Sequence, residues 1–80
     1  MRLDPEQRVI QIIDAAIDLA KTKGLAELNP SNVAEHAGVS RTLVYHYFQT
    51  AENLRDRVLI VASERSETDV IEQARLLKYL

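Results

Sequence analysis

The sequence predicts an all-α fold, with three helices joined by short connections, then a fourth helix and a further C-terminal helical segment. Two observations indicate this class. Apolar residues recur at helical spacing along most of the chain, and glycine and proline occur only twice each. With 80 residues, 46% apolar and 28% charged, the chain has the composition of one small globular domain.

The first helix is expected over Pro5–Lys23. Asp4 can serve as its N-cap, Pro5 suits the first helical position, and Gln7 completes a capping-box spacing. One apolar stripe faces the expected core: Val9, Ile13, Ala16, Ile17 and Ala20, widened by Ile10, Ile12 and Leu19. Gly24 ends the helix after two lysines, which suit its negative end.

Two short helices are expected next, around a tight turn. Asn29-Pro30 repeats the cap-then-proline signature, so a second helix runs over Pro30–Ala37. Gly38 suits a left-handed turn residue, because glycine has no Cβ. Ser40 can then cap a third helix over Arg41–Phe48. In the preceding loop, Leu25 and Leu28 are expected to anchor the chain to the core.

The spacing of three small or aliphatic residues identifies the kind of turn. Ala34 lies one turn before Gly38, where a small side chain lets two helices cross closely. Val44, six residues after Gly38, can point back at Ala34 from the next helix. A small residue, a glycine four positions later and an aliphatic residue six after that are typical of a DNA-binding helix-turn-helix of the three-helix, homeodomain-like kind.

The C-terminal part begins with a fourth helix capped by Thr50, with Leu54, Val58 and Val61 on one face. The polar stretch 63–69 could be a loop, a helix break or a solvated part of a helix, and the pattern does not choose between them. Another apolar helical face follows: Val70, Ala74 and Leu77, flanked by Ile71, Leu76 and Leu80.

Several function classes are excluded. The chain has no cysteine, and His36 and His46 are ten residues apart without zinc-ligand spacing around them, so no metal or cofactor is expected. No Ser-His-Asp pattern or glycine-rich phosphate loop is present, and we expect no enzyme. No apolar run approaches the ~20 residues of a membrane helix, and the acidic, polar N-terminus does not resemble a signal peptide.

The charge distribution bears on nucleic-acid binding. The net charge of −2 is unfavourable, because DNA-binding domains are usually basic. The window from Gly38 to Ala51, however, contains Arg41 and no acidic residue. The expected DNA-facing segment is therefore locally neutral to positive.

The sequence from roughly Val9 to Val61 resembles a known family. The stretch AGVSRTLVYHYFQTAENL resembles the recognition segment of the TetR family of bacterial transcriptional repressors, and VIQIIDAAIDLAKTKG resembles that family's first helix. The resemblance implies a DNA-binding domain over residues 1–50 and a connecting helix with the start of a dimerisation or ligand region over 51–80. It also implies a cytoplasmic, nucleoid-associated homodimer on double-stranded, palindromic operator DNA, and a small-molecule effector only if a domain exists beyond residue 80.

The resemblance also implies site residues. Residues expected at base edges are Arg41, Thr42, Tyr45 and His46. Residues expected at phosphates are Tyr47, Asn29, Ser31, Asn32, Ser40 and Thr50. Tyr45 and Tyr47 point about 200° apart on a helix, so one packs inward and the other outward. For each residue a structural role stays open: a solvated surface position for Arg41 and His46, core packing for the tyrosines, and plain helix capping for the phosphate candidates at helix starts.

Two positions depart from the family pattern and keep a second function open. Leu43 stands where a backbone-contacting threonine is frequent, and Ala51 stands where a lysine often binds phosphate. Both changes remove a polar or positive contact, so weak DNA binding by a monomer is expected. The alternative is a helical protein–protein interaction module that keeps the fold without strong DNA binding.

Overall fold

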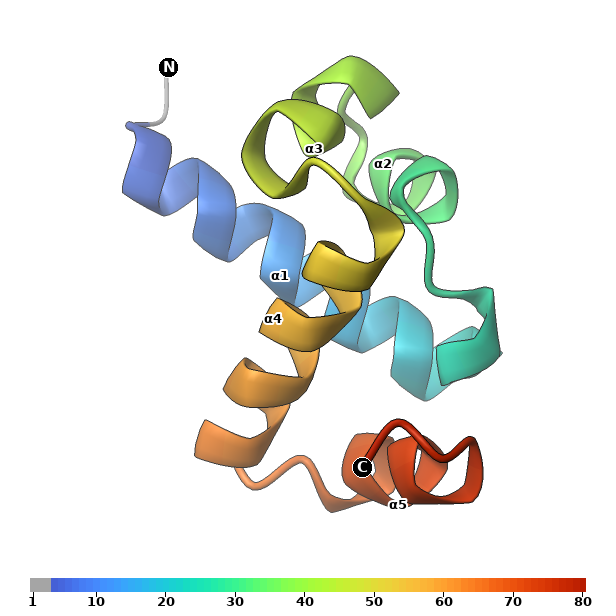
Figure 1. Cartoon of the computed structure of the whole chain (residues 1–80). Helices are drawn as coiled ribbons and strands as arrows, with labels where there is room; N and C mark the ends of the chain where they lie inside the picture. Colours follow the sequence, from blue (N-terminus) through green and yellow to red (C-terminus); the bar gives the residue numbers. More distant parts are fainter. Residues whose placement is uncertain (1–3) are drawn as a thin grey trace.

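The computed structural model describes residues 4–80, and the first three residues of the predicted DNA-binding domain lie outside the described part (Figure 1). The described chain contains five α-helices and one short 3-10 helix, with no strand among these residues. The helices are α1 (Pro5–Lys23), η1 (Leu25–Glu27), α2 (Pro30–Ala37), α3 (Arg41–Phe48), α4 (Ala51–Glu64) and α5 (Thr68–Leu76). The predicted all-α fold is confirmed, and the first three α-helices have the predicted bounds.

The ends of α1 form as their sequence predicts. The Gln7 N–H donates to Oδ1 of Asp4 at 2.8 Å, and the Asp4 N–H donates to Oε1 of Gln7 at 3.3 Å, which completes the capping box. At the other end Gly24 adopts φ 101°, and its N–H still reaches the Ala20 carbonyl at 3.1 Å. Glycine allows the chain to leave the helix here without a Cβ penalty.

The core is a single cluster to which all five α-helices contribute. Helix α1 supplies its largest share: Ile12, Ile13, Ala16, Ile17, Leu19 and Ala20. Leu25 is buried and Leu28 packs against the cluster, as predicted for the loop anchors. Four residues of the expected apolar faces are exposed instead: Ile10 is 49% exposed on α1, and Leu76, Leu77 and Leu80 are 73%, 41% and 65% exposed at the end of α5 and beyond it.

The turn between α2 and α3 has the predicted geometry. Gly38 adopts φ 72° and ψ 32°, in the left-handed region. The Val39 N–H donates to the Ala34 carbonyl at 3.0 Å and the Gly38 N–H to the Glu35 carbonyl at 3.3 Å, which satisfies two carbonyls in the last turn of α2. Ala34 and Val44 are both buried in the core cluster, which is consistent with a close crossing of the two helices.

The connection between α3 and α4 is short and strained. Gln49 adopts φ 64° and ψ −48°, and the Thr50 N–H donates to the Phe48 carbonyl at 2.7 Å. This is a γ-turn of the rare kind with a positive central φ, which is unfavourable for a residue with a side chain. The Thr50 hydroxyl then accepts from the Asn53 N–H at 3.0 Å and caps α4, so two residues reverse the chain.

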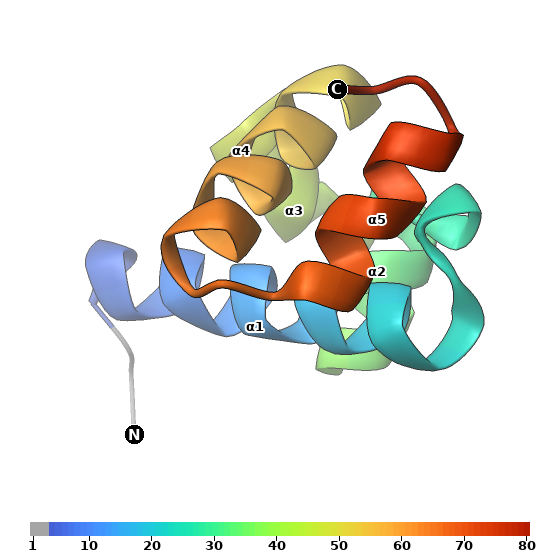
Figure 2. The same ribbon diagram turned by 90° about the horizontal axis from the view of Figure 1, so that it is seen from below.

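The polar stretch 63–69 contains a helix break. Helix α4 ends at Glu64, and α5 starts at Thr68 and lies beside the C-terminal half of α1, as Figures 1 and 2 show. Val70 and Ala74 of α5 are buried there. Of the three alternatives for this stretch, the structure shows a helix break. The break is needed because the chain must turn back to bury this apolar face against α1.

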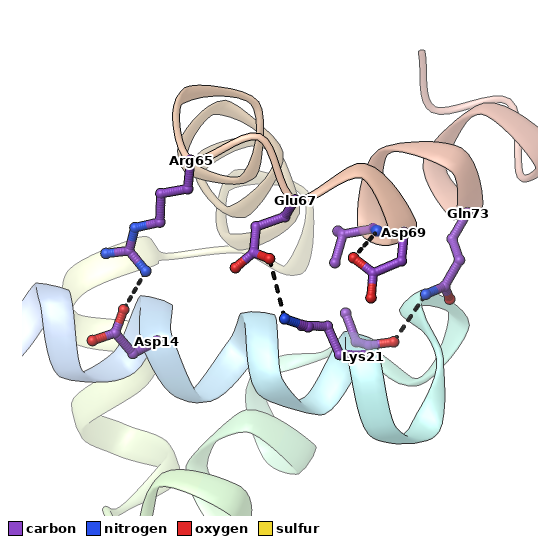
Figure 3. A network of polar contacts seen from close by, with 8 residues as sticks. Asp14, Lys21, Arg65, Glu67, Asp69 and Gln73 are labelled. Atoms are coloured by element: carbon purple, nitrogen blue, oxygen red, sulfur yellow. Dashed lines mark hydrogen bonds and ion pairs between the residues drawn. The ribbon is translucent and has the colours of Figure 1, made fainter.

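Polar contacts fasten this segment to α1 (Figure 3). Gln73 bridges the corner after α1: its Oε1 accepts from the Leu25 N–H at 2.7 Å, and its Nε2 donates to the Ala20 carbonyl at 3.0 Å. Arg65 pairs with Asp14. One side-chain amide thus satisfies the Leu25 N–H, and it adds a second hydrogen bond to the Ala20 carbonyl, which already accepts from the Gly24 N–H.

The third contact of the segment is an exposed ion pair. Lys21 Nζ lies 3.1 Å from Oε1 of Glu67. The hydrogen bond with Glu67, reinforced by the charges of Glu67 and Asp69, raises the pKa of Lys21. Because Lys21 is solvent-exposed, this pair contributes little to stability. The amide bridge of Gln73 is therefore the stronger fastening of α5.

No helix within residues 4–80 combines the length and the apolar character that crossing a membrane requires.

The first prediction concerns Gly38. A Cβ built there would meet no atom within 4 Å, so substitution carries a backbone cost and no clash. We expect Gly38→Val to lower the free energy of unfolding by about 1–2 kcal/mol or more, because β-branched residues resist positive φ. Gly38→Asn is the control, since asparagine tolerates this region. Urea denaturation measures both; equal stability of the Val and wild-type chains would contradict the assigned turn.

The second prediction concerns Gln73. Gln73→Ala leaves the Leu25 N–H without its partner, so we expect a loss of about 1–3 kcal/mol in unfolding free energy. Glu72→Ala, at the exposed neighbouring position, is the matched control and should change stability far less. Thermal denaturation followed by circular dichroism compares them. Equal effects of the two substitutions would show that the amide bridge adds no stability.

Candidate nucleic-acid interface

Helix α3 has a buried side and an exposed side. Val44 and Phe48 are buried in the core, and Leu43 is half-buried. On the other side lie the four residues predicted at base edges, all of them exposed: Arg41, Thr42, Tyr45 and His46. We call these four residues the reading face. They are related by steps of three and four positions, so they form one continuous surface of the helix.

The two tyrosines of α3 separate as their spacing predicts. Tyr45 is 44% exposed on the reading face, whereas Tyr47 is half-buried and packs against the core cluster. The rings of His46 and Tyr47 meet edge to face, with centroids 5.1 Å apart. Tyr47 is therefore the inward member of the pair, and its predicted phosphate contact can come only from the exposed part of the side chain.

Three of the predicted phosphate residues, Asn29, Ser40 and Thr50, are helix N-caps. The Asn29 side chain accepts from the Asn32 N–H at 2.8 Å, and the Asn32 amide donates to the Glu27 carbonyl at 2.8 Å. The Ser40 hydroxyl accepts from the Leu43 N–H at 3.0 Å, and Thr50 caps α4 as described above. Ser31 is exposed in the first turn of α2. A capping hydroxyl or amide still has a hydrogen to donate, so capping is compatible with a phosphate contact. The phosphate role of these residues stays a prediction.

The histidines have separate surroundings. Nε2 of His36 lies 2.7 Å from Oδ2 of Asp18, which joins α2 to α1. His46 lies on the reading face. Within residues 4–80, no group of three or more His, Asp and Glu side chains could hold a metal ion. His36 thus forms a structural contact with α1 that its position in the sequence did not suggest.

A cleft that the sequence did not reveal lies beside the C-terminal end of α3. It has a volume of about 310 Å³ between α1, α3 and α4, with Val9 and Phe48 as apolar walls. Its polar lining consists of Tyr47, Gln49, Asn53, Asp56 and Arg57. Asn53 and Arg57 lie one helical turn apart on α4, and only the γ-turn at Gln49 brings them against α3. No local sequence signal indicates that packing.

The comparisons with known proteins agree with this geometry. The model of the family described as bacterial regulatory proteins, tetR family, matches residues 12–58. The chain is 36% identical over 58 residues to the HTH-type transcriptional regulator LuxR of Vibrio harveyi. The aligned region covers 72% of this chain and 28% of that protein. The chain thus matches little more than a quarter of that relative's length. No solved structure matches it.

The matched region contains α1 from residue 12 onward, the whole helix-turn-helix and the first half of α4. It includes every residue of the reading face and every residue predicted at a phosphate. A family of regulatory proteins also agrees with the expectation that the chain is not an enzyme. By its sequence and by the helix-turn-helix it folds into, the chain belongs to the tetR family of bacterial regulatory proteins.

Proposed function

We propose that the chain is the DNA-binding part of a transcriptional regulator, a repressor that binds a palindromic operator as a homodimer. The observation that carries this proposal is the reading face, four polar or aromatic side chains exposed on a helix whose opposite side is buried. An α-helix fits the major groove, where each base pair presents a distinct pattern of donors and acceptors. The relative in Vibrio harveyi is a transcriptional regulator, which supports the same function for this chain.

Roles within the reading face follow from side-chain chemistry. Arg41, at the first position of α3, can pair with guanine through two hydrogen bonds, and Thr42 can contact a base edge. Tyr45 and His46 lie farther along the same surface and contact bases or the adjoining backbone. Tyr47, Asn29, Ser31, Asn32, Ser40 and Thr50 contact phosphates, the helix-start residues with the help of free N–H groups.

The rest of the chain has supporting roles in this proposal. Residues 1–50 form the DNA-binding domain, and residues 51–80 form the connecting helix and the start of a dimerisation or ligand region. Two-fold symmetry would place two α3 helices in successive major grooves, about 34 Å apart. A small-molecule effector requires chain beyond residue 80. The protein acts in the cytoplasm, on the nucleoid.

A helical protein–protein interaction module is the second candidate function. Two observations favour it: the net charge of −2, and a group of exposed apolar side chains on α4 and the C-terminal segment. These side chains are Ile60, Leu76, Leu77, Tyr79 and Leu80. Such a module would bind its partner through apolar surface, with little dependence on salt.

One experiment separates the two functions. Light scattering measures the mass of the chain with and without random-sequence duplex DNA at low salt. The measurement is then repeated at increasing salt concentrations. A regulator forms a complex that dissociates steeply as salt rises, because released counterions drive phosphate binding. A chain that ignores duplex DNA at every salt concentration contradicts the proposed function. The mass without DNA also decides whether these residues dimerise.

The third prediction concerns Arg41. Arg41→Ala removes a bidentate base contact, so we expect a loss of about 1–3 kcal/mol on the preferred sequence and relaxed preference at one operator position. Selection of binding sites from a random duplex pool measures preference, and fluorescence anisotropy measures affinity. Glu35→Ala, exposed on α2, is the control for a surface change outside α3. An unchanged preferred sequence would count against base contact by Arg41.

A further inference from the structure

Binding a DNA backbone requires positive charge, and α3 with its flanks supplies little of it. Arg41 is the only Lys or Arg of α3, and it lies on the reading face. The first turn of α4 carries Glu52 and no basic residue. Since neutralisation of phosphates supplies essentially all non-specific DNA affinity, a domain with net charge −2 needs a cation elsewhere beside α3.

Most other cations of the described chain are engaged or distant from α3. Arg65 and Lys21 pair with acids along α1 and the start of the C-terminal segment (Figure 3). Arg55 lies over the ring of Tyr79, 4.2 Å from its centroid. Arg8 donates to Gln11. The remaining ones are Lys23, in a separate cleft formed by α1, η1 and α2, and Arg75 and Lys78 in the C-terminal segment.

Arg57 is different, because it shares a cleft with residues of α3. It is exposed, it forms no ion pair within residues 4–80, and it lines the cleft together with Tyr47 and Phe48. Beside it the cleft presents the Asn53 amide and the Tyr47 side chain, both of which can donate hydrogen bonds. A guanidinium with two neighbouring donors is a suitable arrangement for a phosphate.

The length of α3 places this cleft relative to the groove. Eight residues at 1.5 Å each make a helix about 12 Å long, and the major groove is also about 12 Å wide. When the N-terminal end of α3 meets base edges, its C-terminal end therefore reaches the sugar-phosphate strand that borders the groove. The cleft lies at that C-terminal end, between Phe48 and α4.

Two further residues of the cleft lining, Asp56 and Gln49, affect its charge and its geometry. Asp56 is the one acid in its lining, and its Oδ1 lies 3.9 Å from Nε of Arg55, which offsets part of its charge. Gln49 donates through Nε2 to the His46 carbonyl at 3.1 Å, so the γ-turn residue is held by α3. The two-residue connection Gln49–Thr50 therefore holds Tyr47 of α3 in the same cleft as Asn53 and Arg57 of α4.

We propose that Arg57, with Asn53 and Tyr47, binds a backbone phosphate of duplex DNA in this cleft. This inference rests on the proposed function and adds to it a phosphate-binding residue on the second turn of α4. Arg57 supplies charge and a bidentate donor, and Asn53 and Tyr47 orient the phosphate. The contact carries no base preference, so it contributes equally to binding of every sequence.

The fourth prediction tests this with three variants of the 80-residue chain. Arg57→Gln removes the charge, Arg57→Lys retains it, and Arg75→Gln makes the same charge change on exposed α5, which lies at the opposite end of the molecule from α3 (Figure 1). Fluorescence anisotropy measures the Kd of each for a random-sequence and a selected duplex across about 50–200 mM salt. Circular dichroism confirms that each variant is folded.

We expect Arg57→Gln to weaken binding of both duplexes alike, about tenfold at the lowest salt. It should also reduce the slope of log K against log salt by about 1. Arg57→Lys should keep the slope, and Arg75→Gln should leave Kd and slope close to wild type. If Arg57→Gln and Arg75→Gln behave alike while the wild type binds, this inference alone fails. If the wild-type chain binds neither duplex, the proposed function fails and the inference with it.

Discussion

The burial of one side of α1 is the interaction on which the rest of the structure depends. Six of its residues are buried, and α2, η1, α4 and α5 all pack against this helix. Each fully buried Ile or Leu contributes roughly 1.5–3 kcal/mol, so α1 provides the largest share of the apolar core of any helix. The interior of so small a domain is limited, which explains why α5 folds back to add Val70 and Ala74. Gln73 completes that closure by bonding the backbone at the end of α1.

Helix α3 is held mainly through its neighbours α2 and α4. It gives only Val44 and Phe48 to the interior, and this small anchorage leaves half of its surface exposed to a ligand. The two ends of α3 are fixed by different means. The left-handed Gly38 with the Ser40 cap sets its start, and the γ-turn at Gln49 sets its end. The proposed base contacts need such rigid ends, because a binding site requires its side chains to be held within a fraction of an ångström.

The reading face and the main group of exposed apolar side chains lie on different parts of the molecule. The reading face and the Arg57 cleft belong to α3 and the adjoining part of α4, whereas Ile60, Leu76, Leu77, Tyr79 and Leu80 lie on the later part of α4 and in the C-terminal segment. The net charge of −2 therefore does not decide how the α3 side behaves. Acids such as Asp14, Glu67 and Asp69 lie in the network between α1 and the C-terminal segment, where they fasten the fold and stand apart from the reading face. A DNA-binding surface and an acidic protein are compatible when charges are distributed in this way.

The sequence by itself determined the elements and the kind of turn. Caps at Asp4, Asn29, Ser40 and Thr50, the two glycines, and the 3.6-residue periodicity act within a few residues, so α1, α2 and α3 follow from local patterns. The same periodicity placed Arg41 and Tyr45 on one side of α3. Tertiary structure alone decided the rest. Three features depend on which apolar faces are buried together. They are the helix break at residues 65–67, the hydrogen bonds of Gln73 to Leu25 and Ala20, and the shared cleft of Arg57 and Tyr47. A pattern along one helix states which side is apolar, but the partner of that side is chosen by the packing of the whole chain.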